Sequence, residues 1–141
     1  MPRKPPRRTR ERILERALQR FNELGEPNVT ASALGDDLGI SPGNLYYHFP
    51  NKEAIVTALF ADFEAGIGRL LDETARVEVR LEDAAPFLRL LFESIWRHRF
   101  VYRDINDLLS RHRALETGLQ AIVARKTEAA LLSSRQQACG I

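Results

Sequence analysis

Residues 30–48 contain a glycine break between two short helical segments, and this break limits the folds open to the chain more than any other feature. Thr30 is placed to cap the first segment, and Gly39 ends it. Ser41 and Pro42 then supply an N-cap and a first helical residue for a second segment over 42–48. The sequence therefore predicts two short helices joined by a tight turn.

Apolar residues in and beside the two segments are spaced so that the helices pack together. They are Leu34, Leu38, Ile40, Leu45 and Phe49. An apolar repeat at helical spacing also predicts a preceding helix over 9–25, with Thr9 as its N-cap and Gly25 as a left-handed stop. Three helices, the last two joined through a glycine turn, are the components of a helix-turn-helix.

The rest of the chain also has helical periodicity. The predicted elements are a long amphipathic helix from 51 to about 75, a connection over 75–80, a helix with Glu82, Asp83 and Pro86 in its first turns, and helices over 100–112 and 114–132. No segment has the alternating pattern of a strand. We therefore predict an all-α fold, in which a small domain built on the three-helix helix-turn-helix is joined by a long helix to a larger helical domain.

The positive charge of the chain is concentrated at its start. The first ten residues hold five arginine and lysine residues and no acid, whereas the whole chain carries a net charge of only +2. Pro2, Pro5 and Pro6 disfavour helix there. We expect a disordered basic arm over residues 1–8 whose Arg7 and Arg8 follow DNA phosphates, the alternative being a solvated tail without a ligand.

Several classes of protein are excluded by what the sequence lacks. The one cysteine, Cys139, has no partner for a disulfide, and no cysteine and histidine spacing fits a zinc site. No apolar run is long enough for a membrane span, and no apolar signal segment follows the basic start, so we expect a cytoplasmic protein. The chain also lacks a glycine-rich phosphate loop and a catalytic triad pattern, so we expect neither an enzyme nor a cofactor.

The short helix over 42–48 carries the residues most suited to DNA. If Leu45 and Phe49 face the core, the remaining side chains are distributed over exposed sides, where hydroxyl, amide and imidazole groups can bond phosphates and base edges. Gly43 allows close approach of the backbone. Lys52 adds a cation at the start of the next helix. The alternative is that one of Tyr46 and Tyr47 packs against the first helix as a core residue.

These features together resemble a known family. The matching strings are Ile13-Leu14, the Phe21-x-x-Leu24-Gly25 helix ending, Val29-Thr30, Leu38-Gly39-Ile40-Ser41-Pro42-Gly43-Asn44-Leu45-Tyr46-Tyr47-His48-Phe49 and Asn51-Lys52-Glu53. Over about residues 9–60 the chain closely resembles the DNA-binding domain of the TetR family of bacterial transcription repressors. The resemblance implies that the DNA-binding residues are Thr30, Ser32, Ser41, Gly43, Asn44, Tyr46, Tyr47, His48 and Lys52, in addition to Arg7 and Arg8 of the arm.

Two departures from the family pattern matter for this interpretation. Ala31-Ser32-Ala33 stands where members often carry a basic or larger polar residue, and Gly35 stands where alanine is usual, so contacts from that helix are expected to be sparse. Asp36 and Asp37 are expected to point away from the duplex. The family also runs near two hundred residues and closes with two further helices, so this chain is expected to dimerise weakly.

Beyond residue 60 the resemblance implies a sensor domain without naming its ligand. Candidate ligand-binding residues are Phe63, Phe92, Trp96, Phe100, Tyr102 and Asn106, with Phe87, His98 and His112 as further candidates. The alternative for each aromatic residue is an ordinary place in the helical core. Metal binding by His98 and His112 is not expected, because no third ligand shares their helical faces.

We therefore predict a DNA-binding transcription regulator of four parts. They are a disordered basic arm over 1–8, a helix-turn-helix domain over 9–55, a helical sensing and dimerisation domain over 56–132, and a tail over 133–141. The expected partners are a palindromic double-stranded operator, a second copy of the chain and a small hydrophobic effector that releases the repressor from DNA. The alternative is a shortened, ligand-unresponsive relative that binds DNA or sequesters a full-length regulator.

Overall fold

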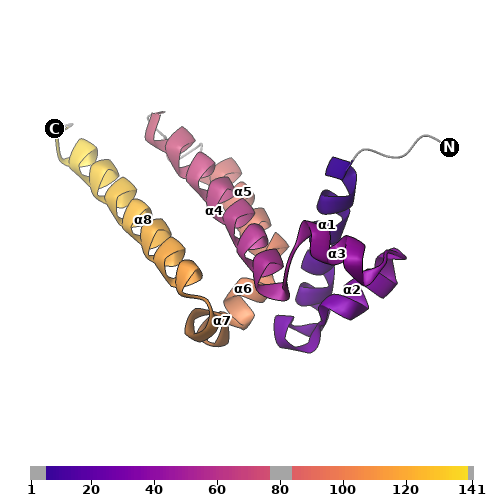
Figure 1. The fold of residues 1–141 in the computed structure, drawn as a ribbon. Helices are drawn as coiled ribbons and strands as arrows, with labels where there is room; N and C mark the ends of the chain where they lie inside the picture. The colour runs from indigo at the N-terminus through magenta and orange to yellow at the C-terminus, as the bar shows by residue number, and fades with distance from the viewer. Residues whose placement is uncertain (1–5, 77–83, 140–141) are drawn as a thin grey trace.

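A computed structural model describes residues 6–76 and 84–139, and all of its regular elements there are helices (Figure 1). In chain order they are α1 (Pro6–Leu24), the 3₁₀ helix η1 (Glu26–Asn28), α2 (Ala31–Leu38), α3 (Pro42–His48), α4 (Lys52–Arg76), α5 (Ala84–Arg97), α6 (Arg99–Arg103), α7 (Ile105–Arg111) and α8 (Arg113–Cys139). The predicted all-α fold is therefore confirmed. No described helix combines the length and apolar content that a membrane span requires.

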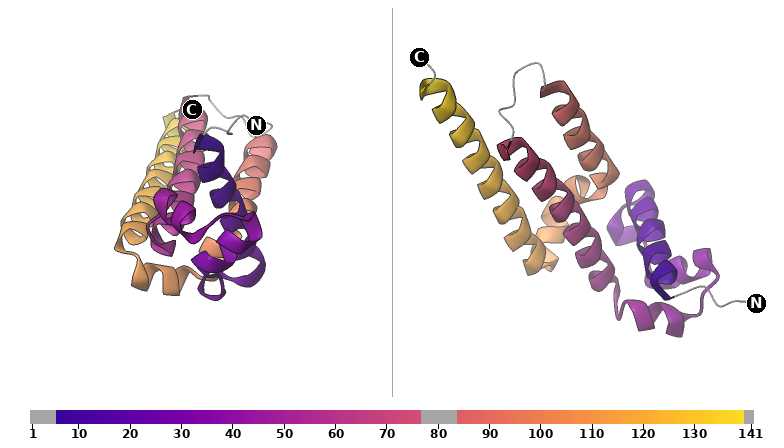
Figure 2. Two further views of the ribbon diagram at one scale, coloured as in Figure 1. Left: turned by 45° about the vertical axis from the view of Figure 1, so that its right-hand side comes forward. Right: turned by 90° about the horizontal axis from the view of Figure 1, so that it is seen from above.

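The helices form two groups that share α4. The first group, called the head below, consists of α1, η1, α2 and α3 and lies to the right in Figure 1. The second group, called the bundle below, has α4 between α5 and α8, with α6 and α7 joining α5 to α8 at the lower end (Figure 2). One apolar cluster runs through both groups, from Ile13 and Phe21 in α1 through Phe63 in α4 to Leu115 in α8.

Local capping signals explain the boundaries of the two short helices. The Thr30 side chain accepts a hydrogen bond from the Ala33 backbone N–H at 3.1 Å, and Ser41 accepts one from Asn44 at 3.2 Å. Gly39 ends α2 in the left-handed region, with φ 64° and ψ 33°. These predicted helix ends are confirmed.

The start of α1 differs from the prediction. The helix begins at Pro6 and not at Thr9, so residues 6–8 of the expected disordered arm are helical. Proline is tolerated in a first turn because its missing N–H would have no partner there. The rest of the arm, residues 1–5, lies outside the described residues. At the other end Gly25 stops the helix, but with φ 90° and ψ 142° it is not in the left-handed helical region, and it leads into η1.

Three predictions for the bundle are also corrected. The single helix expected over 100–112 is divided at Asp104 into α6 and α7. The helix expected over 114–132 runs on to Cys139, so residues 133–139 of the expected tail are helical. Alanine, arginine and glutamine favour helix strongly enough to continue it without an apolar stripe. The connection over 75–80 begins later than predicted, because α4 includes residues 75 and 76, and residues 77–83 with Glu82 and Asp83 lie outside the described residues.

Candidate nucleic-acid interface

The short helix α3 is held to the head by two apolar side chains. Leu45 is 1% exposed and Phe49, which follows the helix, is 3% exposed. The i, i+4 spacing of these residues places them on one side of the helix. As predicted, Leu45 and Phe49 are packing residues, and the other side chains of α3 are left to face outward.

The outward side of α3 presents polar and aromatic groups to solvent. Tyr47 is 82% exposed and Tyr46 is 51% exposed, so neither tyrosine is a core residue of the head. Asn44 is exposed as well, and His48 is half-buried with its ring edge-on to Tyr47, the two centroids being 5.2 Å apart. A Cβ atom added at Gly43 would meet no protein atom within 4 Å. Packing within the protein therefore does not require a glycine at position 43.

The hydroxyl groups of Thr30, Ser32 and Ser41 lie at or near the first turns of α2 and α3, and all three residues are exposed. Thr30 and Ser41 already accept backbone hydrogen bonds as N-caps. A hydroxyl that accepts in this way still has its own proton to donate, and a phosphate oxygen is a strong acceptor for it. Capping and DNA contact are therefore compatible uses of the same two side chains.

Helix α1 carries arginines at four positions separated by one turn, namely Arg8, Arg12, Arg16 and Arg20. The two arginines of the later turns form ion pairs with Asp37 of α2, which lies 3.3 Å from Arg16 and 2.6 Å from Arg20. Its hydrogen bond to Arg20 lowers the pKa of the Asp37 carboxyl. The expectation that Asp37 avoids DNA fits this pairing, because its charge is already used within the head.

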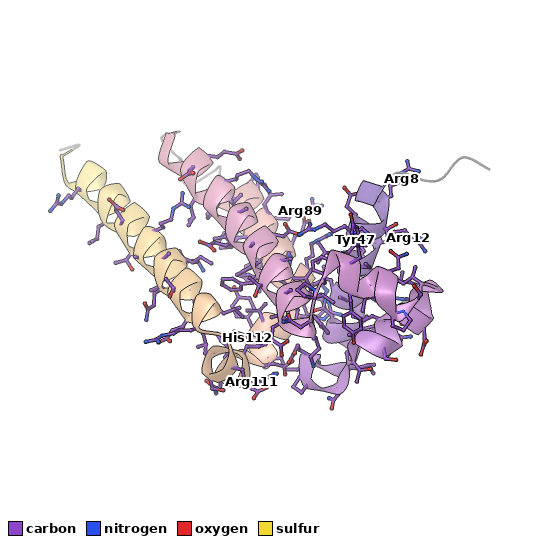
Figure 3. All side chains as sticks on the ribbon, viewed as in Figure 1. Arg8, Arg12, Tyr47, Arg89, Arg111 and His112 are labelled. Carbon is purple, nitrogen blue, oxygen red and sulfur yellow. The ribbon has the colours of Figure 1, made fainter. Side chains whose placement is uncertain are left out.

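Arg8 and Arg12, in the first turns of α1, form no ion pair among the described residues and are exposed (Figure 3). Arg10 lies between them in sequence and stacks over the Phe49 ring, with its guanidinium carbon 5.0 Å from the centroid. The start of α1 therefore lies against the end of α3. Sequence reasoning named Arg7 and Arg8 but missed Arg12, which the four-residue arginine spacing could have shown; nothing is described of the Arg7 side chain.

Lys52, one of the predicted DNA-binding residues, has contacts within the protein that the sequence did not show. Its ammonium group lies 3.1 Å from a Glu26 carboxylate oxygen and donates to the backbone oxygens of Glu26 and Val29 at 3.1 and 3.0 Å. The ammonium group thus donates two hydrogen bonds to backbone oxygens and forms an ion pair with the buried Glu26 carboxylate. Lys52 is therefore held within the head, and its contact with phosphates stays a prediction.

The six candidate ligand-binding residues do not come together in one site. Phe63 and Phe100 are each 1% exposed within the core, and Tyr102 packs edge-on to Phe63 with centroids 5.9 Å apart. Asn106 points outward on α7. Phe63 and Phe100 therefore occupy the helical core, as the alternative interpretation expected, whereas Tyr102 and Asn106 are exposed.

Phe92 and Trp96 instead border a groove of about 890 Å³ between α4 and α5. Trp96 is 69% exposed, and the Arg99 guanidinium stacks 4.8 Å from its ring centroid. Asp62, Gly66 and Arg69 supply the wall from α4. The α5 wall of the groove combines apolar side chains with charged ones, and the α4 wall is polar.

Two histidines are buried, one beside the groove and the other at the end of α7. His98 lines the groove, its Nδ1 is 3.1 Å from the Ser94 carbonyl oxygen, and burial lowers its pKa. His112 is 7% exposed, and its Nε2 has no hydrogen-bond partner among the described residues. Within these same residues no three histidine, cysteine or acidic side chains gather in a way that would hold a metal ion.

Comparison with protein families matches both halves of the chain. The model described as bacterial regulatory proteins, tetR family, matches residues 13–59, which include α2, α3 and the start of α4. A second model, described as bacterial transcriptional repressor, matches residues 62–136 and so includes most of the bundle. The two matches meet within α4, the helix that the head and the bundle share.

Individual proteins similar to this chain are also named as transcription regulators. The chain is similar to the HTH-type transcriptional regulator UidR of Escherichia coli strain K12, with 40% identity over 62 residues, which are 43% of this chain and 32% of that protein. It is 34% identical over 74 residues to the HTH-type transcriptional repressor AcnR of Corynebacterium glutamicum, covering 52% of this chain and 39% of the relative. It therefore spans less than half the length of either protein.

A solved structure extends the similarity over most of the chain. A TetR-family transcriptional regulator from Marinobacter aquaeolei VT8 superposes with a TM-score of 0.81 at 36% identity, covering 86% of this chain and 60% of the other. The fold, the exposed face of α3 and the two family matches agree. The chain belongs to the TetR family of bacterial transcription regulators.

Proposed function

We propose that this chain is a sequence-specific DNA-binding regulator, that α3 enters the major groove, and that it acts in the bacterial cytoplasm. The single observation that carries the proposal is the division of α3 into two sides. Leu45 and Phe49 anchor one side in the head, while Asn44 and Tyr47 stand exposed on the other with no core role. A helix with exposed amide and hydroxyl groups, presented on a rigid support, is suited to bonding base edges and phosphates.

Each DNA-binding residue has a role that follows from its position. We assign base reading to Asn44, and to Ser41 and His48 beside it, because amide, hydroxyl and imidazole groups all bond base edges. Tyr46, Tyr47, Thr30 and Ser32 contact phosphates. Arg8 and Arg12 are the main cations, since their charges are unpaired among the described residues and the charge of Lys52 is paired.

The experiment that tests this proposal is the recovery of bound sequences from randomised duplex DNA by the full chain. We expect a roughly palindromic sequence, because two heads in a symmetric pair read two half-sites in opposite orientation. Asn44→Ala should change the recovered bases at specific positions. The control is Asn106→Ala, the same substitution at an exposed position on α7. No enrichment by the unaltered chain, or equal changes from both variants, would refute the proposal.

We further propose that a small apolar effector binds in the groove between α4 and α5 and weakens DNA binding, which makes the regulator a repressor that the effector releases. Phe92 and Trp96 give the groove an aromatic wall, and its size is in the range of small-molecule sites. The residues over 56–132 then form the sensing domain. A symmetric pair of chains places two heads about 34–36 Å apart on B-DNA, so an effector that alters this spacing lowers affinity.

A thermal-shift screen with apolar compounds separates this mechanism from its alternative. A ligand that binds only the folded protein raises the melting temperature by mass action. We expect the shift to disappear in Trp96→Ala and to persist in Val123→Ala, which alters an equally exposed apolar residue on α8. If no compound stabilises the chain and DNA binding is intact, it is a ligand-unresponsive relative.

A further inference from the structure

The corner where α1 ends is tied to α5, α6 and α7 by polar contacts. The Arg103 guanidinium donates to the Phe21 carbonyl oxygen at 2.7 Å. The Asn22 side chain donates to the Arg97 carbonyl oxygen at 2.8 Å and accepts from the Phe100 backbone N–H at 3.1 Å. These contacts join the head to the bundle at a place remote in sequence from α4, the helix that both groups share.

Glu26 of η1 is at the centre of this corner. It is 1% exposed, yet its carboxylate has two cationic partners, Lys52 at 3.1 Å and Arg111 at 2.5 Å. Its backbone N–H also donates to the Asp104 carboxylate at 3.1 Å. A buried carboxylate is costly unless it is paired and hydrogen-bonded, so the two cations explain why an acid can be buried here.

The two cations come from opposite sides of the corner. Lys52 begins α4 and also bonds two backbone oxygens of the segment between α1 and α2, so it belongs to the head. Arg111 ends α7, and its guanidinium is shared between Glu26 and Asp107 of its own helix. Figure 3 shows Arg111 at the lower end of the molecule, where α7 approaches the loop after α1. Of the two ion pairs of Glu26, only the one with Arg111 joins the bundle to the head.

The two ion pairs of Glu26 also differ in the effect that losing each one would have on the buried carboxylate. Without Arg111, the Glu26 carboxylate would still have the Lys52 ammonium beside it, so the head would keep a paired buried acid. The Arg111 side chain is itself 37% exposed, so its removal opens no cavity in the core. Loss of Arg111 therefore removes a link between the two groups of helices and leaves each group packed.

We infer that Arg111 is a positioning residue for DNA binding, which through Glu26 fixes the orientation of the head on the bundle. The inference rests on the proposed function of α3 as the DNA-reading helix. Binding to two half-sites requires both heads at one spacing, so a head that is held by fewer contacts at this corner, and therefore tilts more, loses affinity for the whole operator. Binding of one head to one half-site does not depend on that spacing.

The first test compares a whole operator with one half-site. The probes are a palindromic duplex recovered from the randomised library and the same duplex with one half-site scrambled. Arg111→Gln should lower affinity about tenfold on the whole duplex and leave affinity for the scrambled duplex within about twofold. Arg113→Gln, which removes the same charge from an exposed residue two positions on, should alter neither. Equal losses on both probes, or no loss on either, would overturn the inference.

A second test needs no DNA, so it stands even if the proposed function fails. Spin labels are placed at the exposed positions Ser32 in α2 and Val123 in α8, as Ser32→Cys and Val123→Cys in a Cys139→Ser background, and labelled chains are diluted with unlabelled ones. The distance distribution between labels should broaden in Arg111→Gln and remain unchanged in Arg113→Gln. An unchanged distribution in Arg111→Gln would show that the link does not hold the head in place.

Discussion

The head and helix α5 differ in the kind of residue that each exposes to solvent. In the head, the apolar residues of α1, α2 and α3 are mostly buried, Leu24 being an exception, and the exposed face of α3 is rich in polar and hydroxyl-bearing groups. In α5 no residue is buried, although its apolar residues repeat at helical spacing, and Leu88, Phe92 and Trp96 are all exposed.

The exposed polar groups of the head and the exposed apolar residues of α5 therefore have different physical consequences. The head is a completed packing unit, so its exposed residues are free for recognition of a polar ligand. An apolar stripe on α5 at positions i, i+4 and i+8 is instead a surface that gains stability when something apolar covers it. Substitutions can therefore be designed that affect one region and spare the other.

The largest contrast is expected in the free energy of unfolding. Leu45→Ala should lower it by about 2–5 kcal/mol, because the substitution leaves a cavity beneath α3. Leu88→Ala, on the exposed side of α5, should change it by less than about 0.5 kcal/mol. Denaturant unfolding of both variants measures the contrast. Similar losses from the two substitutions would mean that α5 is as tightly packed as the head.

A smaller effect is expected on DNA affinity when one hydroxyl group is removed from α3. If Tyr47 bonds a phosphate as proposed, Tyr47→Phe removes a hydrogen bond to a charged group, which should cost about 1.5 kcal/mol or roughly tenfold in affinity. Tyr102→Phe makes the same change in α6, where the ring packs against Phe63, and should leave affinity unaltered. Fluorescence titration with the selected duplex measures both, and a loss in Tyr102→Phe alone would place the interface elsewhere.

The smallest effect is expected in the pH dependence of stability. Burial lowers the pKa of His98 below its ordinary value of 6.5, and the hydrogen bond to Ser94 opposes that shift only in part. The unfolded chain therefore binds a proton more readily than the folded one. The contribution of neutral His98 is complete above its unfolded pKa and is lost as the pH falls through the lower folded pKa.

Melting temperatures from about pH 7.5 to pH 5 test this effect in the unaltered chain and in His98→Gln. The unaltered chain should lose more stability on acidification than the variant, which has no imidazole to protonate at this position. Parallel curves for the two proteins would show that His98 is protonated as easily in the folded state as in the unfolded chain.

The parts of the fold that were predictable from sequence depend on neighbouring residues. The N-caps Thr30 and Ser41 and the left-handed Gly39 determine helix ends through contacts within four residues, so residues 30–48 were assigned correctly. The apolar spacing of Leu45 and Phe49 likewise identified which side of α3 is buried. These are local signals that a single sequence displays.

The features that could not be predicted depend on residues distant in sequence. Nothing near Lys52 in the sequence shows that its ammonium group contacts Glu26, 26 residues earlier, so this contact could not be predicted. The break between α6 and α7 lies at Asp104, whose carboxylate bonds the Glu26 backbone across 78 residues. Phe63 and Phe100 were candidates for a pocket because periodicity does not distinguish a packed core from a hollow one.

Gly43→Leu tests most directly the claim that the exposed face of α3 reads DNA. A Cβ atom at this position has open space around it, and leucine favours helix over glycine by about 1 kcal/mol, so the melting temperature should stay the same or rise. Affinity for the selected duplex should fall about tenfold or more, because the side chain fills the space through which the backbone approaches DNA. Ala61→Leu, at an exposed position of α4, controls for an added leucine. A Gly43→Leu protein that is folded and binds the duplex with unchanged affinity would contradict the account.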